Sequence, residues 1–119
     1  MSYVRLASDE RPQVVWELRV LGSWVERMRG LLGTGPGVPA VLLPRCRSIH
    51  TYGMRYAIDV AFVAGDGTVL RVVRSLGPGS CAAHPDAVCV LERPSGEGDW
   101  VREGEHLWTA SLSVGMVGA

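Results

Sequence analysis

Apolar and polar positions alternate along residues 14–20, the first regular pattern in the chain. The even-numbered positions are apolar and include Trp16, whereas the positions between them include Glu17 and Arg19. Because successive side chains of a strand point to opposite faces, this period of two predicts a β-strand. We expect its even-numbered face to pack toward the core.

A short helix is predicted to begin after this strand. Ser23 and Glu26 have the spacing of a capping box, in which the serine accepts a backbone hydrogen bond and the glutamate bonds back. Apolar residues then recur at helical spacing and form one stripe: Trp24, Met28, Leu31 and Leu32. Gly33 is placed to end the helix after about three turns.

Five further segments have the apolar content of strands, and turn-forming residues separate them. They cover residues 40–43, 58–62, 68–74, 87–92 and 106–114. Asp66-Gly67 lies between the second and third segments and predicts a β-hairpin. Residues 76–85 are expected to loop over the surface, and residues 96–103 to form a helical turn.

About six short strands and one helix predict an α+β fold that is mostly β. We expect a curled, mainly antiparallel sheet or small barrel with one short N-terminal helix. The 119 residues suffice for one core, so a single domain is expected over residues 1–119. Trp16, Trp24 and Trp108 are predicted to pack in that core, whereas the place of Trp100, between charged residues, is left open.

The composition is typical of a folded, soluble domain. Hydrophobic residues make up 47% of the chain, which argues against disorder. Twelve basic and twelve acidic residues cancel, so a nucleic-acid or anionic membrane partner is disfavoured. No apolar run approaches the roughly 20 residues of a spanning helix, and residues 1–11 lack a signal-peptide core. An odd number of cysteines suits a reducing compartment, so a cytoplasmic protein is expected.

Chemically functional side chains are densest between Cys46 and Phe62. Asp59 stands out because a carboxylate inside an apolar strand must either face solvent or bind a buried partner. Arg55, Arg27 and backbone amides are the candidate partners. A structural anchor held by hydrogen bonds is as compatible with this pattern as a functional carboxylate.

His50 lies nine residues before Asp59, and Gly53 would allow the chain to bend and bring the two together. Such a pair resembles a general-base dyad, and the candidate nucleophiles beside it are Ser48, Thr51 and Cys46. The sequence contains no G-x-S-x-G motif, so a small hydrolase-like enzyme is the second interpretation.

Cysteine and histidine also occur in two closely spaced pairs. They are Cys46-x3-His50 and Cys81-x2-His84, with Cys89 nearby, and they provide zinc-type ligands. Structural zinc sites usually have tighter spacing, and free cysteines are often small buried hydrophobes. A structural zinc-binding domain is therefore the third interpretation.

Five arginines on the helix and around the cluster could bind an anion even though the net charge is zero: Arg27, Arg29, Arg45, Arg47 and Arg55. A guanidinium group binds carboxylate or phosphate in a bidentate manner. The alternative is that these arginines pair on a solvated face with Glu17, Glu26 and Asp59.

An ordered series of motifs runs from about Val14 to Leu107: Arg27-Met28-Arg29-Gly30-Leu31-Leu32, I-H-T-Y-G-M-R-Y-A-I-D-V-A-F, Asp66-Gly67 and Val90-Leu91-Glu92. With this series the chain resembles DUF192, a family of domains of unknown function. The resemblance implies a single DUF192-like domain with a mostly β fold and a short helix near its start. It also implies a widespread prokaryotic family without an established activity.

The commoner family version carries a Trp-Met-Lys-Asn-Thr run where this chain, aligned on Asp59, has residues 50–54. A role that rests on the family's tryptophan or asparagine is therefore not carried over. Family members are often exported behind a signal peptide, which residues 1–11 do not provide. The positions that match the family are Arg29, Gly30, Leu31, Asp59, Phe62, Gly67 and Glu92.

We therefore expect a small uncharacterised domain that binds a ligand or serves as an accessory or interaction module. Its polar recess is predicted around His50 and Asp59. The partner would be a small anionic ligand or another protein, and no cofactor or metal is assigned. The candidate ligand-binding residues are His50, Thr51, Arg55, Asp59, Arg29 and Glu92.

Overall fold

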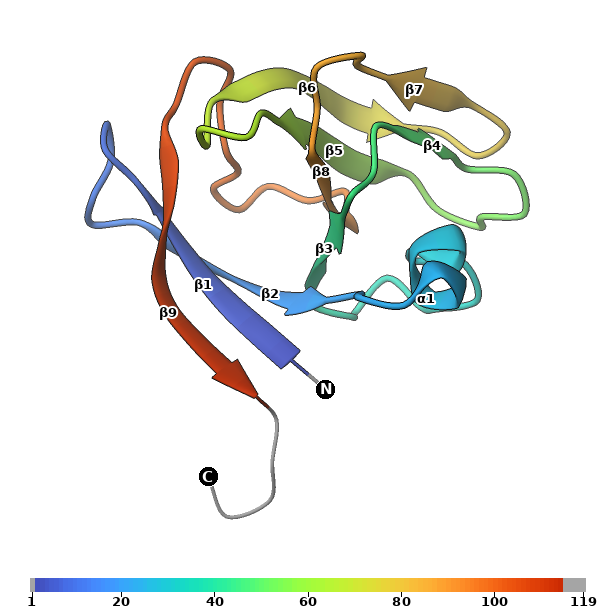
Figure 1. The fold of residues 1–119 in the computed structure, drawn as a ribbon. Coiled ribbons are helices and arrows are strands. Elements are labelled where there is room, and N and C mark those ends of the chain that lie inside the picture. The colour runs from blue at the N-terminus through green and yellow to red at the C-terminus, as the bar shows by residue number, and fades with distance from the viewer. Residues whose placement is uncertain (1, 115–119) are drawn as a thin grey trace.

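A computed structural model describes residues 2–114 of the chain. These residues contain nine strands and one short helix, joined by turns and loops (Figure 1). In chain order they are β1 (Ser2–Ser8), β2 (Val15–Val20), α1 (Trp24–Arg29), β3 (Ala40–Pro44), β4 (Ser48–His50), β5 (Ile58–Val63), β6 (Val69–Leu76), β7 (Cys81–Ala83), β8 (Cys89–Pro94) and β9 (Leu107–Val114). Seven strands form one sheet in the order β6-β5-β8-β3-β2-β1-β9, and β4 pairs with β7 in a second, smaller sheet.

The large sheet curls into a half-barrel (Figure 1). Its neighbouring strands are antiparallel except β2 and β3, which pair in parallel. Parallel strands need a long connection, and the connection between these two contains α1. The predicted class is confirmed: a mostly β protein of the α+β type, with a curled, mainly antiparallel sheet and one short N-terminal helix.

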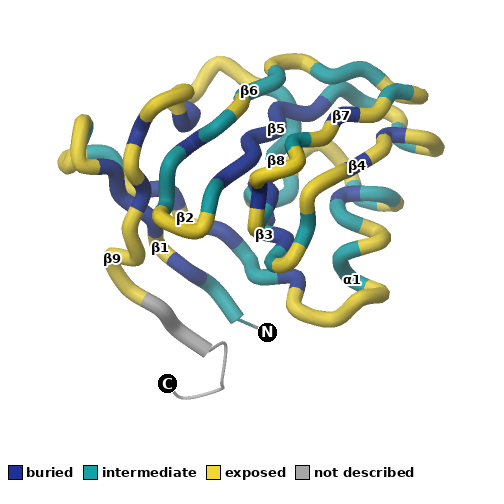
Figure 2. The backbone as a smooth tube through the Cα atoms, turned by 45° about the horizontal axis from the view of Figure 1, so that its top comes forward, coloured by how far each residue is buried: buried dark blue, intermediate teal, exposed yellow. Residues whose placement is uncertain are grey.

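Strand β5, which lies between β6 and β8 in the large sheet, is buried along its whole length (Figure 2). Its side chains alternate between two apolar clusters. Phe62 belongs to a cluster that includes Ile49 of β4, whereas Val63 belongs to a cluster that includes Leu18 of β2. The predicted hairpin is confirmed, because β5 and β6 pair antiparallel across the turn at Asp66-Gly67. The other predicted strands correspond to β2, β3, β8 and β9.

The helix begins as predicted but ends earlier. The capping box is confirmed, because the Ser23 side chain accepts from the Glu26 backbone and the Glu26 side chain bonds back. The predicted end at Gly33 is wrong, since α1 spans six residues and Gly30 follows it with φ 51° and ψ −122°. An L-residue rarely adopts a positive φ, so the chain leaves the helix where a glycine permits it.

Two of the three tryptophans predicted to lie in the core are exposed. Trp16 is buried, but 64% of Trp24 and 46% of Trp108 are accessible to solvent. Trp24 is exposed because α1 lies on the outside of the molecule and buries none of its residues. Trp108 lies on β9, an edge strand of the large sheet. Trp100, for which the sequence favours neither the core nor the surface, is buried, and the Arg93 guanidinium lies 4.8 Å from its ring centroid.

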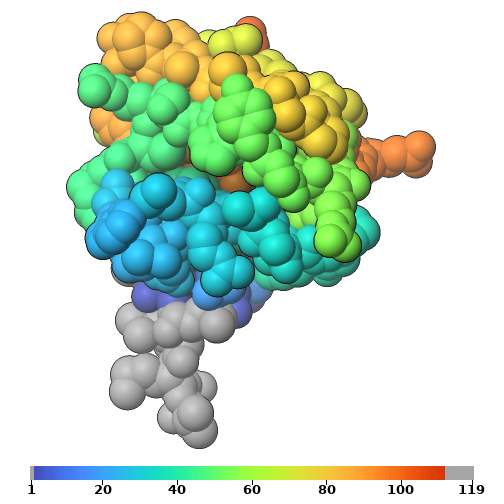
Figure 3. Space-filling model, turned by 90° about the vertical axis from the view of Figure 1, so that its right-hand side faces the viewer, coloured from blue at the N-terminus to red at the C-terminus, as the bar shows by residue number. Residues whose placement is uncertain are grey.

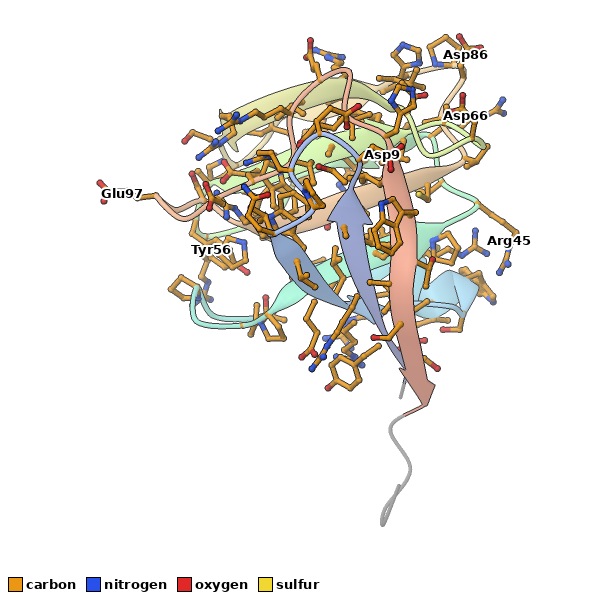
Figure 4. The ribbon with its side chains drawn as sticks, turned by 90° about the vertical axis from the view of Figure 1, so that its left-hand side faces the viewer. Asp9, Arg45, Tyr56, Asp66, Asp86 and Glu97 are labelled. Atoms are coloured by element: carbon orange, nitrogen blue, oxygen red, sulfur yellow. The ribbon has the colours of Figure 1, made fainter. Side chains whose placement is uncertain are left out.

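Three segments differ from their predicted structure. Residues 2–8 form β1, for which no strand was predicted, and the predicted surface loop at residues 76–85 contains β7. The helical turn predicted at residues 96–103 is wrong. Arg93 donates instead to the carbonyl oxygens of Gly96, Gly98 and Asp99, which holds this segment as an irregular loop from which Glu97 projects outward (Figure 4).

Candidate functional site

A cavity of about 330 Å³ lies between α1 and the sheets. It is bounded by the helix and the turn after it, by the segment from Cys46 to His50, and by parts of β5 and β8. The space-filling view shows this hollow between the blue helix and the green segment that contains β4 (Figure 3). The capping box and the early end at Gly30 therefore place α1 as one wall of the cavity.

Apolar side chains form most of the cavity wall. Met28 comes from α1 and Leu31 from the turn after it, whereas Ile49 comes from β4 and Ile58 from the start of β5. Met54 lies between β4 and β5. Of these residues, Met28 is 67% exposed, and Leu31, Ile49 and Ile58 are buried. Methionine side chains adapt to irregular shapes, so this wall suits a ligand with an apolar body.

Glu92 of β8 contributes the buried acid of the cavity and is only 4% exposed. Its cross-strand neighbours are Val41 of β3 and Val60 of β5, both of which are buried. Burial in these apolar surroundings raises the pKa of Glu92 to about 7, and the backbone N–H of Leu31 offsets this only in part. Glu92 is therefore partly protonated near neutral pH.

The backbone of Gly30 approaches the Glu92 carboxylate closely. A Cβ atom at position 30 would lie 2.7 Å from Glu92 Oε1. The positive φ of Gly30 disfavours every other residue type at the same position. Two independent constraints thus require glycine where the helix end meets the buried acid.

Five further polar or charged residues line the cavity: Arg27, Arg29, Cys46, Ser48 and His50. Arg27 Nη1 donates to the backbone oxygen of Arg45 over 3.1 Å, but Arg27 Nε is buried without a hydrogen-bond partner. Arg45 itself projects from the edge of the molecule that carries α1 (Figure 4). Cys46 Sγ donates to the Ser48 oxygen, and burial raises the pKa of this thiol.

Asp59 lies away from the cavity, in a buried polar network. Its oxygens accept from the backbone N–H of Ser75, the hydroxyl of Ser95 and the Nε of Arg93, and Arg74 lies 3.3 Å away. Burial alone would raise the pKa of Asp59, but these hydrogen bonds and charges outweigh it and lower the pKa. Arg55 and Arg27, the side chains predicted as its partners, are replaced in this role by Arg93 and Arg74.

Thr51 is fully buried and holds a loop in place. Its backbone N–H donates to the Ser80 oxygen, and its hydroxyl donates to the Gly77 oxygen and accepts from the Ser80 N–H. These bonds join residue 51 to the segment that leads into β7. Arg55 lines a different hollow, beside Gly33, Thr34 and Gly53.

No protein-family model matches this sequence, and no curated protein matches it. Two solved structures share its fold. One is a protein from Sinorhizobium meliloti 1021 described as a "putative transcription regulator", with 20% identity, a TM-score of 0.74, and coverage of 92% of this chain and 93% of that one. The other is a protein of unknown function from Novosphingobium aromaticivorans DSM 12444, with 17% identity, a TM-score of 0.64, and coverage of 89% and 83%. At these identities the similarity shows the fold alone.

The structure separates the six predicted site residues into different places. Arg29, His50 and Glu92 line the cavity. Thr51 instead holds the loop before β7, and Arg55 lines the second hollow. Asp59 lies in the buried polar network. Sequence reasoning did not place Met28, Met54 and Cys46 around a cavity. The one available signal was their position in the sequence, because Met28 and Met54 lie within the motifs and Cys46 lies close to one. Glu92 carried the same signal as Asp59, a carboxylate in an apolar run.

The two alternative chemistries find no support in this arrangement. The described partners of the Asp59 carboxylate are two serines and two arginines, so His50 is not oriented by it. Within residues 2–114, no three side chains of the His, Cys, Asp and Glu types are grouped so that they could hold a metal ion. Burial also raises the pKa of Cys89 to about 11, which keeps that thiol protonated.

No helix among the described residues is long and apolar enough to cross a membrane. The one helix, α1, has six residues. A spanning helix needs about 20.

Proposed function

We propose that this chain is a ligand-binding domain whose small organic ligand occupies the cavity between α1 and the sheets. The observation that carries the proposal is Glu92, a buried carboxylate that lines the cavity without a cationic partner among the described residues. A buried ionisable group with a strongly raised pKa in a cleft is a candidate functional residue.

A comparison with the other two buried acids supports this proposal. Asp59 pairs with Arg93 and Arg74, and Glu105 pairs with Arg11. Both have lowered pKa values, whereas that of Glu92 is raised. Burial of an unpaired charge is strongly unfavourable. A carboxyl group with only a structural role is therefore expected to have a cationic partner, as Asp59 and Glu105 do.

The size and the wall of the cavity indicate the kind of ligand. A volume of about 330 Å³ is at the lower end of the range for small-molecule sites, which favours a compact molecule. The wall is mostly apolar, with a few polar groups, as such sites usually are. Arg27 adds a buried Nε–H without a partner, and this donor would suit an oxygen atom of the ligand.

We also propose that the chain is a DUF192-like domain of a prokaryotic protein that works in the cytoplasm. Four of the seven positions that match the family, Arg29, Gly30, Leu31 and Glu92, line the cavity. The three cysteines are free, which suits a reducing compartment. That the partner is an anion or another protein stays a prediction.

Titration of isotope-labelled protein with a library of small fragments, followed by amide chemical shifts, tests ligand binding. We expect several compact apolar fragments to shift the amides of Leu31, Ile49 and Glu92. The variant Met28→Trp, which adds bulk at the cavity wall, should weaken this binding. Val25→Trp is the matched control, because Val25 is 51% exposed on the same helix and does not line the cavity. Fragments that bind elsewhere, or none that bind at millimolar concentration, would contradict the proposal.

A further inference from the structure

The charge of the most buried polar residue of the cavity indicates which ligand the cavity would take. Glu92 is more than nine-tenths buried, and the one described group that stabilises its charged form is the backbone N–H of Leu31. A carboxylate has about four acceptor positions, so most of its hydrogen-bonding capacity remains unused. The free acceptors belong to a residue that lines an apolar cavity.

The arginines of the cavity do not neutralise Glu92. Arg27 uses Nη1 for the backbone oxygen of Arg45, and Arg29 is exposed. Neither guanidinium is among the groups that lower the pKa of Glu92. The charged or titratable groups that line the cavity with Glu92 are Arg27, Arg29, Cys46 and His50. None of these four side chains forms a hydrogen bond or an ion pair with the carboxylate within residues 2–114.

We propose, on the basis of the ligand-binding function above, that the ligand carries an amine on a compact apolar body and that the ammonium group binds the Glu92 carboxylate. An ammonium group provides the donors that the free carboxylate acceptors lack. The pair forms in a site of low dielectric constant, where the attraction is strong and the hydrogen bonds offset the loss of hydration. An acidic ligand would instead place a second negative charge beside Glu92, which disfavours binding.

The proposal is tested with three probes of nearly equal size: benzylamine, benzyl alcohol and benzoate. Each is titrated into the labelled protein at pH 7.5, and the affinity is measured from amide shifts of residues around the cavity. We expect benzylamine to bind at least about tenfold more tightly than benzyl alcohol, and benzoate to bind most weakly. This ratio corresponds to about 1.4 kcal/mol.

Glu92→Gln separates charge from shape. Glutamine keeps an acceptor for the Leu31 N–H but cannot carry the negative charge, so the advantage of benzylamine over benzyl alcohol should disappear while the alcohol still binds. The melting temperature and amide spectrum of Glu92→Gln show that it is folded. Glu17→Gln makes the same change at an exposed site on β2 and should leave all three affinities unchanged.

The pH dependence provides a second readout. Only ionised Glu92 attracts the ammonium group, so benzylamine affinity should fall by about tenfold or more between pH 7.5 and pH 5.5, whereas benzyl alcohol affinity should stay constant. His50 also lines the cavity and could repel the amine when protonated. His50→Gln should therefore retain the pH dependence, and Glu92→Gln should lose it. Loss of the dependence in His50→Gln alone would overturn the role of Glu92.

The chain contains no lysine, so a carbodiimide can locate a bound amine with little background. The reagent adds to the protonated carboxyl group to form an O-acylisourea. The probe ammonium then loses a proton to water, and its neutral nitrogen attacks the acyl carbon and displaces the urea to form an amide bond. We expect benzylamine to be coupled at Glu92 and this product to be absent from Glu92→Gln. Coupling confined to exposed acids would contradict the proposed placement.

The outcomes distinguish this inference from the proposed function. Equal affinity of all three probes, or preference for benzoate, would overturn the amine while leaving a ligand-binding cavity. Preference for benzoate would instead support the anionic ligand that the arginines predict. If none of the probes and no other fragment shifts the cavity residues, both proposals fail together.

Discussion

Three buried carboxyl groups in one small protein illustrate how the surroundings of a residue decide its state. Asp59 and Glu105 are paired with arginine, and their pKa values are lowered despite burial. Glu92 lies between apolar cross-strand neighbours, and its pKa is raised to about 7. The same type of group thus pairs with arginine in two places and has no cationic partner among the described residues in the third.

The raised pKa of Glu92 predicts how stability depends on pH. Its folded-state pKa of about 7 lies above its ordinary value of 4.5, so the folded protein holds this proton more tightly than the unfolded chain. The stability contribution is fully present below pH 4.5 and is lost as pH rises through 7, by about 3 kcal/mol in all.

Glu92→Gln removes this titration. The free energy of unfolding of the variant, relative to the wild type, should therefore rise by up to about 3 kcal/mol between pH 4 and pH 8. Urea unfolding over this pH range measures the difference. Glu17→Gln, at an exposed site, should show no such trend, and a flat difference for Glu92→Gln would contradict the unpaired burial of Glu92.

Among the elements, α1 is positioned by the residues at its two ends and not by burial of a face. None of its residues is buried, although Leu31, just beyond its end, is. The capping box fixes where the helix begins. Gly30 fixes where it ends and allows the chain to pass close to Glu92. A helix held in this way presents Trp24 and Met28 to the cavity and to solvent together.

Gly30→Ala should therefore be strongly destabilising. The new Cβ atom would meet Glu92 Oε1 at 2.7 Å, and the backbone has φ 51°, so we expect a loss of about 2 kcal/mol or more in the free energy of unfolding. Gly35→Ala is the matched control, because no atom lies within 4 Å of its new Cβ position. Urea unfolding of both variants should show the loss in Gly30→Ala only; equal stability of the two would contradict the close approach.

At the scale of the whole molecule, the two ends of the described chain are joined. β1 pairs with both β2 and β9, so residues from the N-terminal and C-terminal segments share one sheet. Beside this junction, Arg11 Nε donates to Glu105 Oε2 over 2.7 Å, and the Ser8 hydroxyl donates to the same oxygen. Arg11 also donates to the Trp100 backbone oxygen. This buried ion pair links segments that are 94 residues apart.

Removal of Arg11 should leave the Glu105 charge buried and unpaired. We expect Arg11→Met to lower the free energy of unfolding at pH 7 by about 3–5 kcal/mol, as for other broken buried pairs. Arg5→Met removes one partner of the exposed pair with Glu17, and it should cost less than about 1 kcal/mol.

The contribution of Glu105 to stability depends on pH with the opposite sign to that of Glu92. The pKa of Glu105 is lowered in the folded state, because hydrogen bonds from Arg11, Arg102 and Ser8 together outweigh the effect of burial, the largest single contribution. The stability that ionised Glu105 contributes to the fold is therefore fully present above pH 4.5, its ordinary pKa. This contribution is lost as pH falls through the folded-state pKa. The loss caused by Arg11→Met should shrink at low pH, and urea unfolding at pH 3 and pH 7 would measure it. Equal losses of unfolding free energy at pH 3 and pH 7 would contradict the pairing of Arg11 with ionised Glu105.

Features that depend on neighbouring residues were predictable from the sequence. Alternation at residues 14–20 and 58–62 predicted strands, because backbone geometry alone sends successive side chains to opposite faces. The capping box predicted the start of α1, since its bonds join residues only three apart. The mostly β class followed from these local patterns.

The partners of each face and of each charged group depend instead on how distant segments pack. Trp24 and Trp108 lie on apolar patterns, but no element within residues 2–114 covers them, whereas Trp100 is buried despite its charged neighbours. Asp59 meets Arg93 because the register of β5 and β8 places them opposite each other, 34 residues apart. The same register places Val60 opposite Glu92, and the register of β3 and β8 places Val41 opposite it on the other side. Whether a carboxylate becomes an anchor or a free binding group depends on such long-range pairing, which local periodicity does not encode.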